Sequence, residues 1–187
     1  MAARKEQVPI DQASLVPLYS ALIGGALTLT GSALGIWLSK HLERKYEAKQ
    51  LAKAFKGEIS ALVHIAEVRG YSNGLRRVAR LCEEENELRI YSVAVREEYR
   101  AIYKANAGKI GLLPGTMPER IAILYTQVAS ILEDLKTLHE IQIGTRDKFI
   151  LGGLKEAVRK YLEMADLMDD TVAKAKGVVK LIDDKYP

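Results

Sequence analysis

Cysteine is nearly absent from this chain of 187 residues, in which Cys82 is the single example. One thiol can form neither an intramolecular disulfide nor a cysteine-based zinc site within one chain, so a reducing compartment fits best. Cys82 also precedes three glutamates, an acidic neighbourhood that disfavours a reactive thiolate, and we interpret it as a small core residue. Proline is scarce too, and no stretch combines low hydrophobicity with high net charge, which excludes a disordered chain.

Motifs that would name a reaction or a cofactor are also missing. Gly108 and Lys109 belong to no sequence of the form GxxxxGK followed by Ser or Thr, so residues 106–116 are interpreted as an ordered loop rather than a phosphate site. Four acidic residues lack the glycine-centred spacing of an EF-hand loop and are interpreted as a solvated helix face. These are Glu163, Asp166, Asp169 and Asp170. No metal-binding motif includes any of the three histidines, which are His41, His64 and His139. We therefore expect no enzymatic activity, no cofactor and no metal.

The formal net charge of +4 is concentrated in one short segment. Residues 1–14 and residues 57–187 each hold equal numbers of acidic and basic side chains. Residues 40–56, which we call the basic segment, hold six basic side chains and two acidic ones. Because the basic segment directly follows the apolar stretch described next, we expect no nucleic-acid binding.

Charge is absent from residues 12–39, and within them Leu15–Leu38 forms an apolar stretch of 24 residues. A helix of that length would be ~36 Å long, enough to cross a hydrocarbon core of about 30 Å. Tyr19 and Trp37 lie near its two ends, where amphipathic rings prefer the membrane interface. We therefore predict a transmembrane helix over residues 15–39.

Two other interpretations of this stretch are weaker. A cleaved signal peptide could use Arg4 and Lys5 as its basic region. However, the apolar part of a signal peptide ends at about 15 residues, and this stretch is longer and ends at a basic cluster typical of stop-transfer segments. A buried helix of a soluble protein, the other alternative, rarely stays free of charge over so many residues.

The distribution of basic residues around the span predicts its orientation. Two of them precede the span and six follow it, so the positive-inside rule places the C-terminal part in the cytoplasm. Basic side chains close to the bilayer are expected to contact anionic lipid head groups, at about 1 kcal/mol each. These are Lys40, Arg44, Lys45, Lys49 and Lys53.

Small residues recur at intervals of three and four within the span and share one helix face, which we call the small-residue face. It consists of Ser20, Gly24, Thr28, Gly31, Gly35 and Ser39. Helices associate in lipid through close approach of their backbones, which small residues permit, and Gly31 and Gly35 form a GxxxG pair. We predict a homo-oligomer assembled through this face, against the alternative that glycine is simply common in membrane helices.

Apolar spacing after the span predicts helices throughout. A short tail over residues 1–14 and the transmembrane helix would be followed by a basic stalk helix over residues 40–69 and a bundle of about four helices over residues 70–187. Tyr71–Gly74 is interpreted as a polar turn between two helices. Residues 89–95 are interpreted as a bend or further helix, because no second strand pattern exists to pair with them. The predicted fold class is all-α.

The later helices have clearer limits. Thr116 and Glu119 stand at capping-box spacing, which predicts a helix that starts there and runs through Leu138. In the last helix, apolar residues from Leu154 to Ile182 alternate steps of four and three. This narrow stripe is typical of a long antiparallel bundle seam or of a coiled coil between chains.

Taken in order, these features form a recognisable pattern: a glycine-rich span, a basic flank, the segment ANAGKIGLLP at residues 105–114, and Ile123–Tyr125 on a helix. The pattern resembles uncharacterised small single-span membrane proteins of bacteria and their phages, over most of the chain. The resemblance implies a helical cytoplasmic domain at a bacterial inner membrane, and it implies no activity, cofactor or catalytic residue.

We therefore predict a single-pass membrane protein that serves as an interaction or scaffold module. It would self-associate and position a protein partner at the inner membrane, with membrane lipid, a second copy and that protein as its partners. The alternative from a different class is an oligomeric pore-forming or membrane-perturbing effector, which would assemble several spans through the small-residue face. A hydrolase or nucleotide-dependent enzyme would need convergent polar groups that no motif in the sequence provides.

Overall fold

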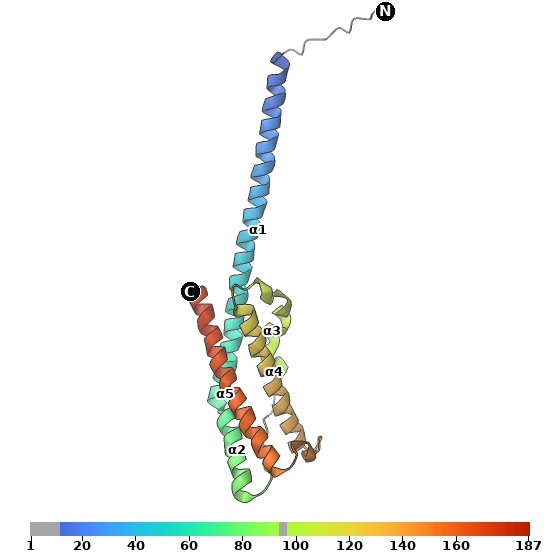
Figure 1. Ribbon diagram of the computed structural model, residues 1–187, viewed down its shortest axis with the longest axis vertical. Coiled ribbons are helices and arrows are strands. Elements are labelled where there is room, and N and C mark those ends of the chain that lie inside the picture. The colour runs from blue at the N-terminus through green and yellow to red at the C-terminus, as the bar shows by residue number, and fades with distance from the viewer. Residues whose placement is uncertain (1–11, 94–96) are drawn as a thin grey trace, which may run out of the picture. The chain divides into compact units, whose positions relative to one another are not determined.

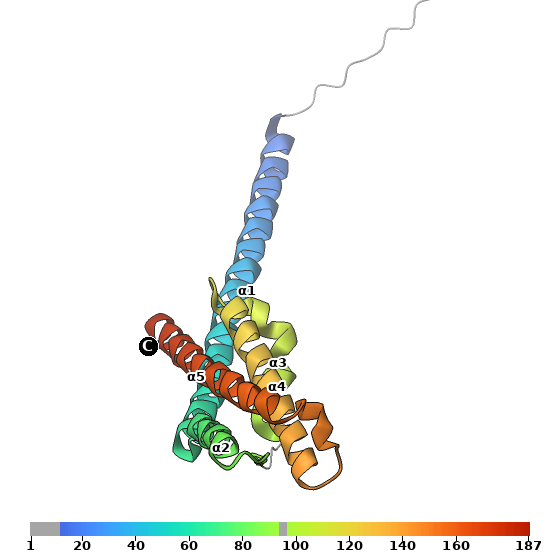
Figure 2. The same cartoon turned by 60° about the horizontal axis from the view of Figure 1, so that its bottom comes forward.

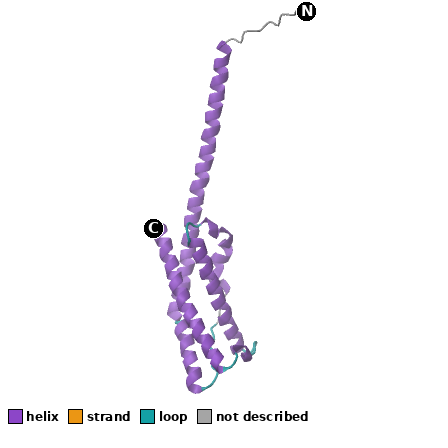
Figure 3. Ribbon diagram, in the orientation of Figure 1, coloured by secondary structure: helices purple, strands orange, loops and turns teal. Residues whose placement is uncertain are grey.

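Helices make up all the regular secondary structure of the described residues (Figure 3). The computed structural model describes residues 12–93 and 97–187. The longer helices are α1 (Gln12–Arg69), α2 (Tyr71–Glu85), α4 (Met117–Gln142) and α5 (Leu154–Lys185). The shorter ones are α3 (Ala101–Asn106) and the 3-10 helices η1 (Glu97–Arg100), η2 (Ala107–Leu112) and η3 (Lys148–Leu151). The predicted all-α class with about four long helices is confirmed.

The chain divides into two units, Met1–Tyr46 and Glu47–Pro187. In the first unit the structure describes one element, the N-terminal part of α1. Among the described residues, no helix combines the length and the apolarity needed to cross a bilayer. The transmembrane helix predicted over residues 15–39 is therefore not confirmed.

Some predictions fall on residues outside the description. The tail predicted for residues 1–14 lies mostly within residues 1–11, which are not described, and so do Arg4 and Lys5. The side chain of Tyr19 and the last part of the segment 89–95 are also outside the described part. Residues 89–93, which are described, form neither a helix nor a strand.

In the second unit, α5 runs alongside both α2 and α4, as two views show (Figures 1 and 2). The apolar stripe predicted for the last helix forms this contact. Tyr161 and Ala165 are fully buried within it, and Met168 and Ala175 are nearly so. The stripe therefore serves as a packing seam inside one chain, because α5 meets two other helices along its length.

The core of the second unit consists of two clusters of buried apolar side chains. We call the first the α2 cluster, and its members include Leu75, Ala79, Cys82, Ile131, Leu135, Leu138, Tyr161, Ala165 and Met168. We call the second the α1 cluster, and its members include Leu51, Ala52, Phe55, Ile59, Met117, Ile121, Leu124, Tyr125, Ala175, Val178 and Ile182. Both clusters draw side chains from α4 and α5, so these two helices extend through the whole core.

The α1 cluster shows that residues predicted as a stalk contribute to the core. Phe55 and Ile59 of α1 are fully buried, and Leu51 is 6% exposed. Their spacing of four places them on one face of the helix, which packs against α4 and α5. From Glu47 onward, α1 is therefore a helix of the bundle.

Two helix boundaries differ in detail from the predictions. The polar turn predicted for Tyr71–Gly74 is wrong, because α2 begins at Tyr71 and Gly70 alone separates it from α1. Gly70 has a left-handed backbone (φ +57°), a conformation that glycine adopts without steric cost. The start of α4 after Thr116 is confirmed, but Thr116 makes no side-chain capping bond, because its φ of −89° and ψ of 1° depart from the extended geometry of a capping residue.

Candidate functional site

The small-residue face lies on the part of α1 that belongs to the first unit, and all six of its residues are exposed. The Thr28 hydroxyl donates a hydrogen bond to the Gly24 carbonyl one turn earlier, at 2.8 Å. A Cβ atom added at Gly24, Gly31 or Gly35 would meet no atom within 4 Å. These glycines are therefore not required by packing within the described chain, so their role as a contact face between chains stays a prediction.

Large apolar side chains on the same part of α1 are exposed. Leu34 is 66% exposed, Trp37 is 65% exposed, and Ile36 and Leu38 are each more than half exposed. The Trp37 ring stacks on the His41 ring one turn later, with centroids 5.6 Å apart and planes 7° from parallel. Every described side chain from residue 20 to residue 46 is exposed, and those described between residues 20 and 39 carry no charge.

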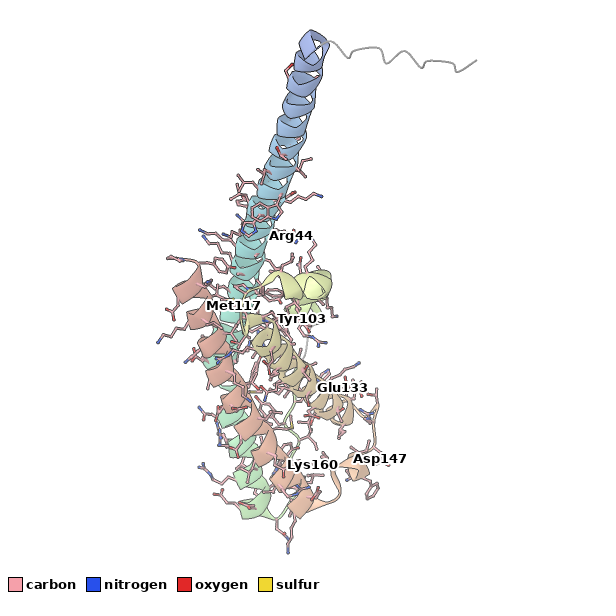
Figure 4. All side chains as sticks on the ribbon, turned by 45° about the horizontal axis from the view of Figure 1, so that its top comes forward. Arg44, Tyr103, Met117, Glu133, Asp147 and Lys160 are labelled. Atoms are coloured by element: carbon pink, nitrogen blue, oxygen red, sulfur yellow. The ribbon has the colours of Figure 1, made fainter. Side chains whose placement is uncertain are left out.

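The predicted lipid-contacting bases divide between the two units. Lys40, Arg44 and Lys45 are exposed in the first unit, and Figure 4 labels Arg44 there. In the second unit Lys53 is exposed and Lys49 is half-exposed. None of these five side chains forms an ion pair with another described residue, whereas Lys109 pairs with Glu47 at 2.8 Å. Their charges are therefore available to an external anionic surface.

Glu58, on α1 in the second unit, joins three helices. Its carboxylate accepts hydrogen bonds from the backbone N–H groups of Ile102 and Tyr103, with N···O distances of 2.6 and 3.1 Å. The Tyr125 hydroxyl of α4 donates to the same carboxylate. One acidic side chain thus holds the start of α3 against α1 and α4, and we call this arrangement the Glu58 clamp.

Aromatic rings surround the Glu58 clamp. The Tyr103 ring stacks on the Tyr125 ring with centroids 4.1 Å apart, and the Phe55 ring is tilted against both at 6.3 and 6.2 Å. Burial raises the pKa of Tyr125, and the hydrogen bond to Glu58 raises it further. The hydroxyl therefore stays protonated at physiological pH and remains a donor. Figure 4 labels Tyr103 and Met117 at this end of the bundle and Asp147 and Lys160 at the other end.

A second polar arrangement fixes the segment that follows α2. The backbone N–H of Arg89 donates a hydrogen bond to the Cys82 sulfur at 3.2 Å. The Tyr161 hydroxyl donates one to the backbone carbonyl of Arg89 at 3.0 Å. Burial raises the pKa of Tyr161 to about 12. Cys82 is fully buried, which confirms its interpretation as a core residue. Its sulfur also serves as a hydrogen-bond acceptor, a role that the sequence did not indicate.

The four acidic residues of α5 that were interpreted as a solvated face form ion pairs with basic side chains. Arg76 of α2 bridges Asp166 and Asp169, at 2.6 and 2.7 Å. Glu163 pairs with Arg159, and Asp170 pairs with Lys174. A hydrogen bond from Ser72 lowers the pKa of Asp169, and Arg76 lowers it further. Within the described residues, no group of three or more histidine, cysteine or acidic side chains is placed to hold a metal ion.

Sequence reasoning missed the Glu58 clamp, although one signal for it exists. Glu58 lies three residues after Phe55 and four before Leu62, so it occupies the apolar face of α1. A carboxylate on such a face needs hydrogen-bond donors from its neighbours. The identity of those donors depends on residues more than forty positions away, which no local pattern contains.

Comparisons with known proteins provide no family or function for this chain. No protein-family model matches the chain, and no curated protein or solved structure is significantly similar to it.

Proposed function

We propose that this protein is a membrane-anchored helical module that self-associates and positions a protein partner at the inner face of a bacterial inner membrane. One observation carries the proposal: residues 12–39 contain no charge, and the large apolar side chains described there are exposed. Apolar surface around a whole helix is stable in lipid or under another protein, but not in water. The basic segment that follows supports the lipid environment, because its unpaired charges suit anionic head groups.

The second unit supports the partner-binding part of the proposal. In the connection between α4 and α5, Phe149 is 80% exposed, and Ile143 and Ile150 are at least half exposed. Lys148 lies beside Phe149 in the same segment. Neighbouring exposed apolar side chains are typical of a contact surface for another protein, and a charged residue beside them fits its polar rim.

Membrane anchoring is tested by fractionation of cells that express the full chain. We expect the wild-type protein to stay with alkali-washed membranes and to need detergent for release. The double variant Gly25→Lys, Thr28→Lys places two charges near the middle of the apolar stretch, each costing about 2.5–3.5 kcal/mol on insertion, so it should leave the membrane fraction. The matched control is Ser60→Lys, Ala61→Lys, at exposed positions of the same helix in the second unit. Wild-type protein in the soluble fraction, or equal loss in the control, would contradict anchoring.

Self-association is tested separately with the double variant Gly31→Leu, Gly35→Leu. Bulky side chains on the small-residue face prevent close backbone approach, and losing 1–2 kcal/mol of helix contact weakens association by about tenfold. Sedimentation equilibrium in detergent should show a shift toward the monomer. Gly25→Leu, which lies off this face, serves as the control. An unchanged oligomer mass in the double variant would rule out association through this face.

A further inference from the structure

The core of the second unit is interrupted by an apolar cavity of about 90 Å³. Its walls come mainly from the helices α1, α4 and α5, and Tyr71 of α2 and Tyr99 of η1 complete the lining. Representative lining residues are Leu62 and Ala66 of α1, Val128 and Leu132 of α4, and Met168 and Val172 of α5.

The cavity lies between the two clusters of the core. Ile131 and Met168 of the α2 cluster line it, and so do Ile59 and Leu124 of the α1 cluster. Leu62 and Leu132 also line it and are only half-buried, so the space reaches the surface of the unit. A ligand can therefore enter without unfolding of either cluster.

The chemistry of the lining excludes polar ligands. No polar atom is exposed inside the cavity. Three lining residues carry hydroxyl groups, Tyr71, Tyr99 and Thr171, and the Thr171 hydroxyl donates to the Leu167 carbonyl at 2.6 Å. Water in such a space would need two to four polar partners that the walls do not provide. The favourable occupant is therefore a hydrocarbon group, whose transfer from water removes apolar surface.

The dimensions of the lining favour an elongated occupant. Along α4 the lining extends from Leu124 to Leu135, which at 1.5 Å per residue is ~16 Å. Along α1 it extends from Ile59 to Ala66, which is ~10 Å. Because the lining residues follow two helices over these lengths, the lining suits a linear chain.

We propose that this cavity binds the end of an unbranched aliphatic chain. Two sources carry that chemistry, a free fatty acid and the acyl tail of a phospholipid. The proposal does not depend on membrane anchoring, because the cavity is formed entirely by residues of the second unit. An apolar side chain of a protein partner is the competing occupant, and absence of saturable binding in both arms of the test below would favour it.

The test uses cis-parinaric acid, a linear fatty acid whose fluorescence rises in apolar surroundings. The full chain is held in a fluorinated surfactant, which supplies no hydrocarbon chains, or in buffer if it is soluble. We expect saturable binding of the probe. In a second arm, the same chain is mixed with a phospholipid that carries a parinaroyl tail. Saturation in the first arm alone identifies a free fatty acid as the source, and saturation in the second identifies a lipid tail.

Matched variants of α1 locate the binding. Ala66→Leu fills the cavity with three extra carbon atoms and should weaken probe binding by about tenfold or more. Ala61→Leu makes the same change at an exposed position five residues earlier and should leave binding unchanged. Far-UV circular dichroism checks folding, and Val172→Leu, on α5, provides a second filling variant. Absence of saturable binding in both arms, or equal binding by Ala66→Leu and Ala61→Leu, would overturn the proposal.

Discussion

Replacing Phe55 by alanine is expected to lower the free energy of unfolding of the second unit by about 3–5 kcal/mol. The side chain is fully buried in the α1 cluster and contacts the Tyr103 and Tyr125 rings. Its removal deletes a large apolar contact and leaves a cavity that three helices would have to close. A loss of this size would establish that α1 is part of the bundle, because truncating a side chain on a solvated stalk would not lower the free energy of unfolding by this amount.

Urea unfolding followed by circular dichroism measures this change. The control is Leu42→Ala, another apolar truncation on the same helix, at a residue that is 57% exposed. Its effect should stay within about 0.5 kcal/mol, as for other surface substitutions. Equal effects of the two variants would mean that residues 47–69 do not pack in the bundle.

The other large effect is expected for Glu58→Leu, which should cost about 3 kcal/mol. The substitution keeps most of the side-chain volume but removes the acceptor for two backbone N–H groups and for the Tyr125 hydroxyl. Partly buried donors without an acceptor lose their hydration without compensation, which is the reason for the large value. The same unfolding experiment measures it.

Two variants separate the Glu58 clamp from general charge effects. Glu67→Leu, on the same helix, removes a surface carboxylate that pairs with Lys176 at 2.6 Å, and should cost about 0–1 kcal/mol. Tyr125→Phe removes one of the three donors together with its need for an acceptor, and should cost about 1 kcal/mol. If Glu58→Leu proved as mild as Glu67→Leu, the clamp would have no structural importance.

The sequence was sufficient for the fold class and for the later helices. Apolar residues from Leu154 to Ile182 repeat at helical spacing without interruption, and α5 follows that repeat from Leu154 to Lys185. The start of α4 was also predicted, from the spacing of Thr116 and Glu119, although Thr116 makes no side-chain capping bond. These are local properties, in which the residues that specify the element lie within it.

Other features depended on contacts between distant residues. Nothing local distinguishes a solvated stalk from a core helix at Phe55, since both carry apolar residues at helical spacing. The break between α1 and α2 consists of Gly70 alone, which has a left-handed backbone. The polar residues after it suggested a longer turn. The cavity was unpredictable for a related reason: its size depends on how side chains of several helices fit together.

The features of the candidate site also differ in whether local sequence could predict them. Spacing alone places Gly31 and Gly35 on one helix face, and the structure gives them open surroundings. Whether a second chain or lipid occupies that space is a property of the environment, which one isolated chain does not contain. The Glu58 clamp, by contrast, required knowledge of which donors meet the carboxylate.

The cavity is lined by residues of both the α1 cluster and the α2 cluster, and the helices α4 and α5 contribute to both. We therefore expect the second unit to behave as two segments that unfold separately. A destabilising substitution near Cys82 and one near Phe55 should therefore have additive effects on the free energy of unfolding, as for sites that share no contacts. Amide hydrogens at the two ends would then exchange with solvent at separate rates. The bundle can fray at one end while the other end remains closed.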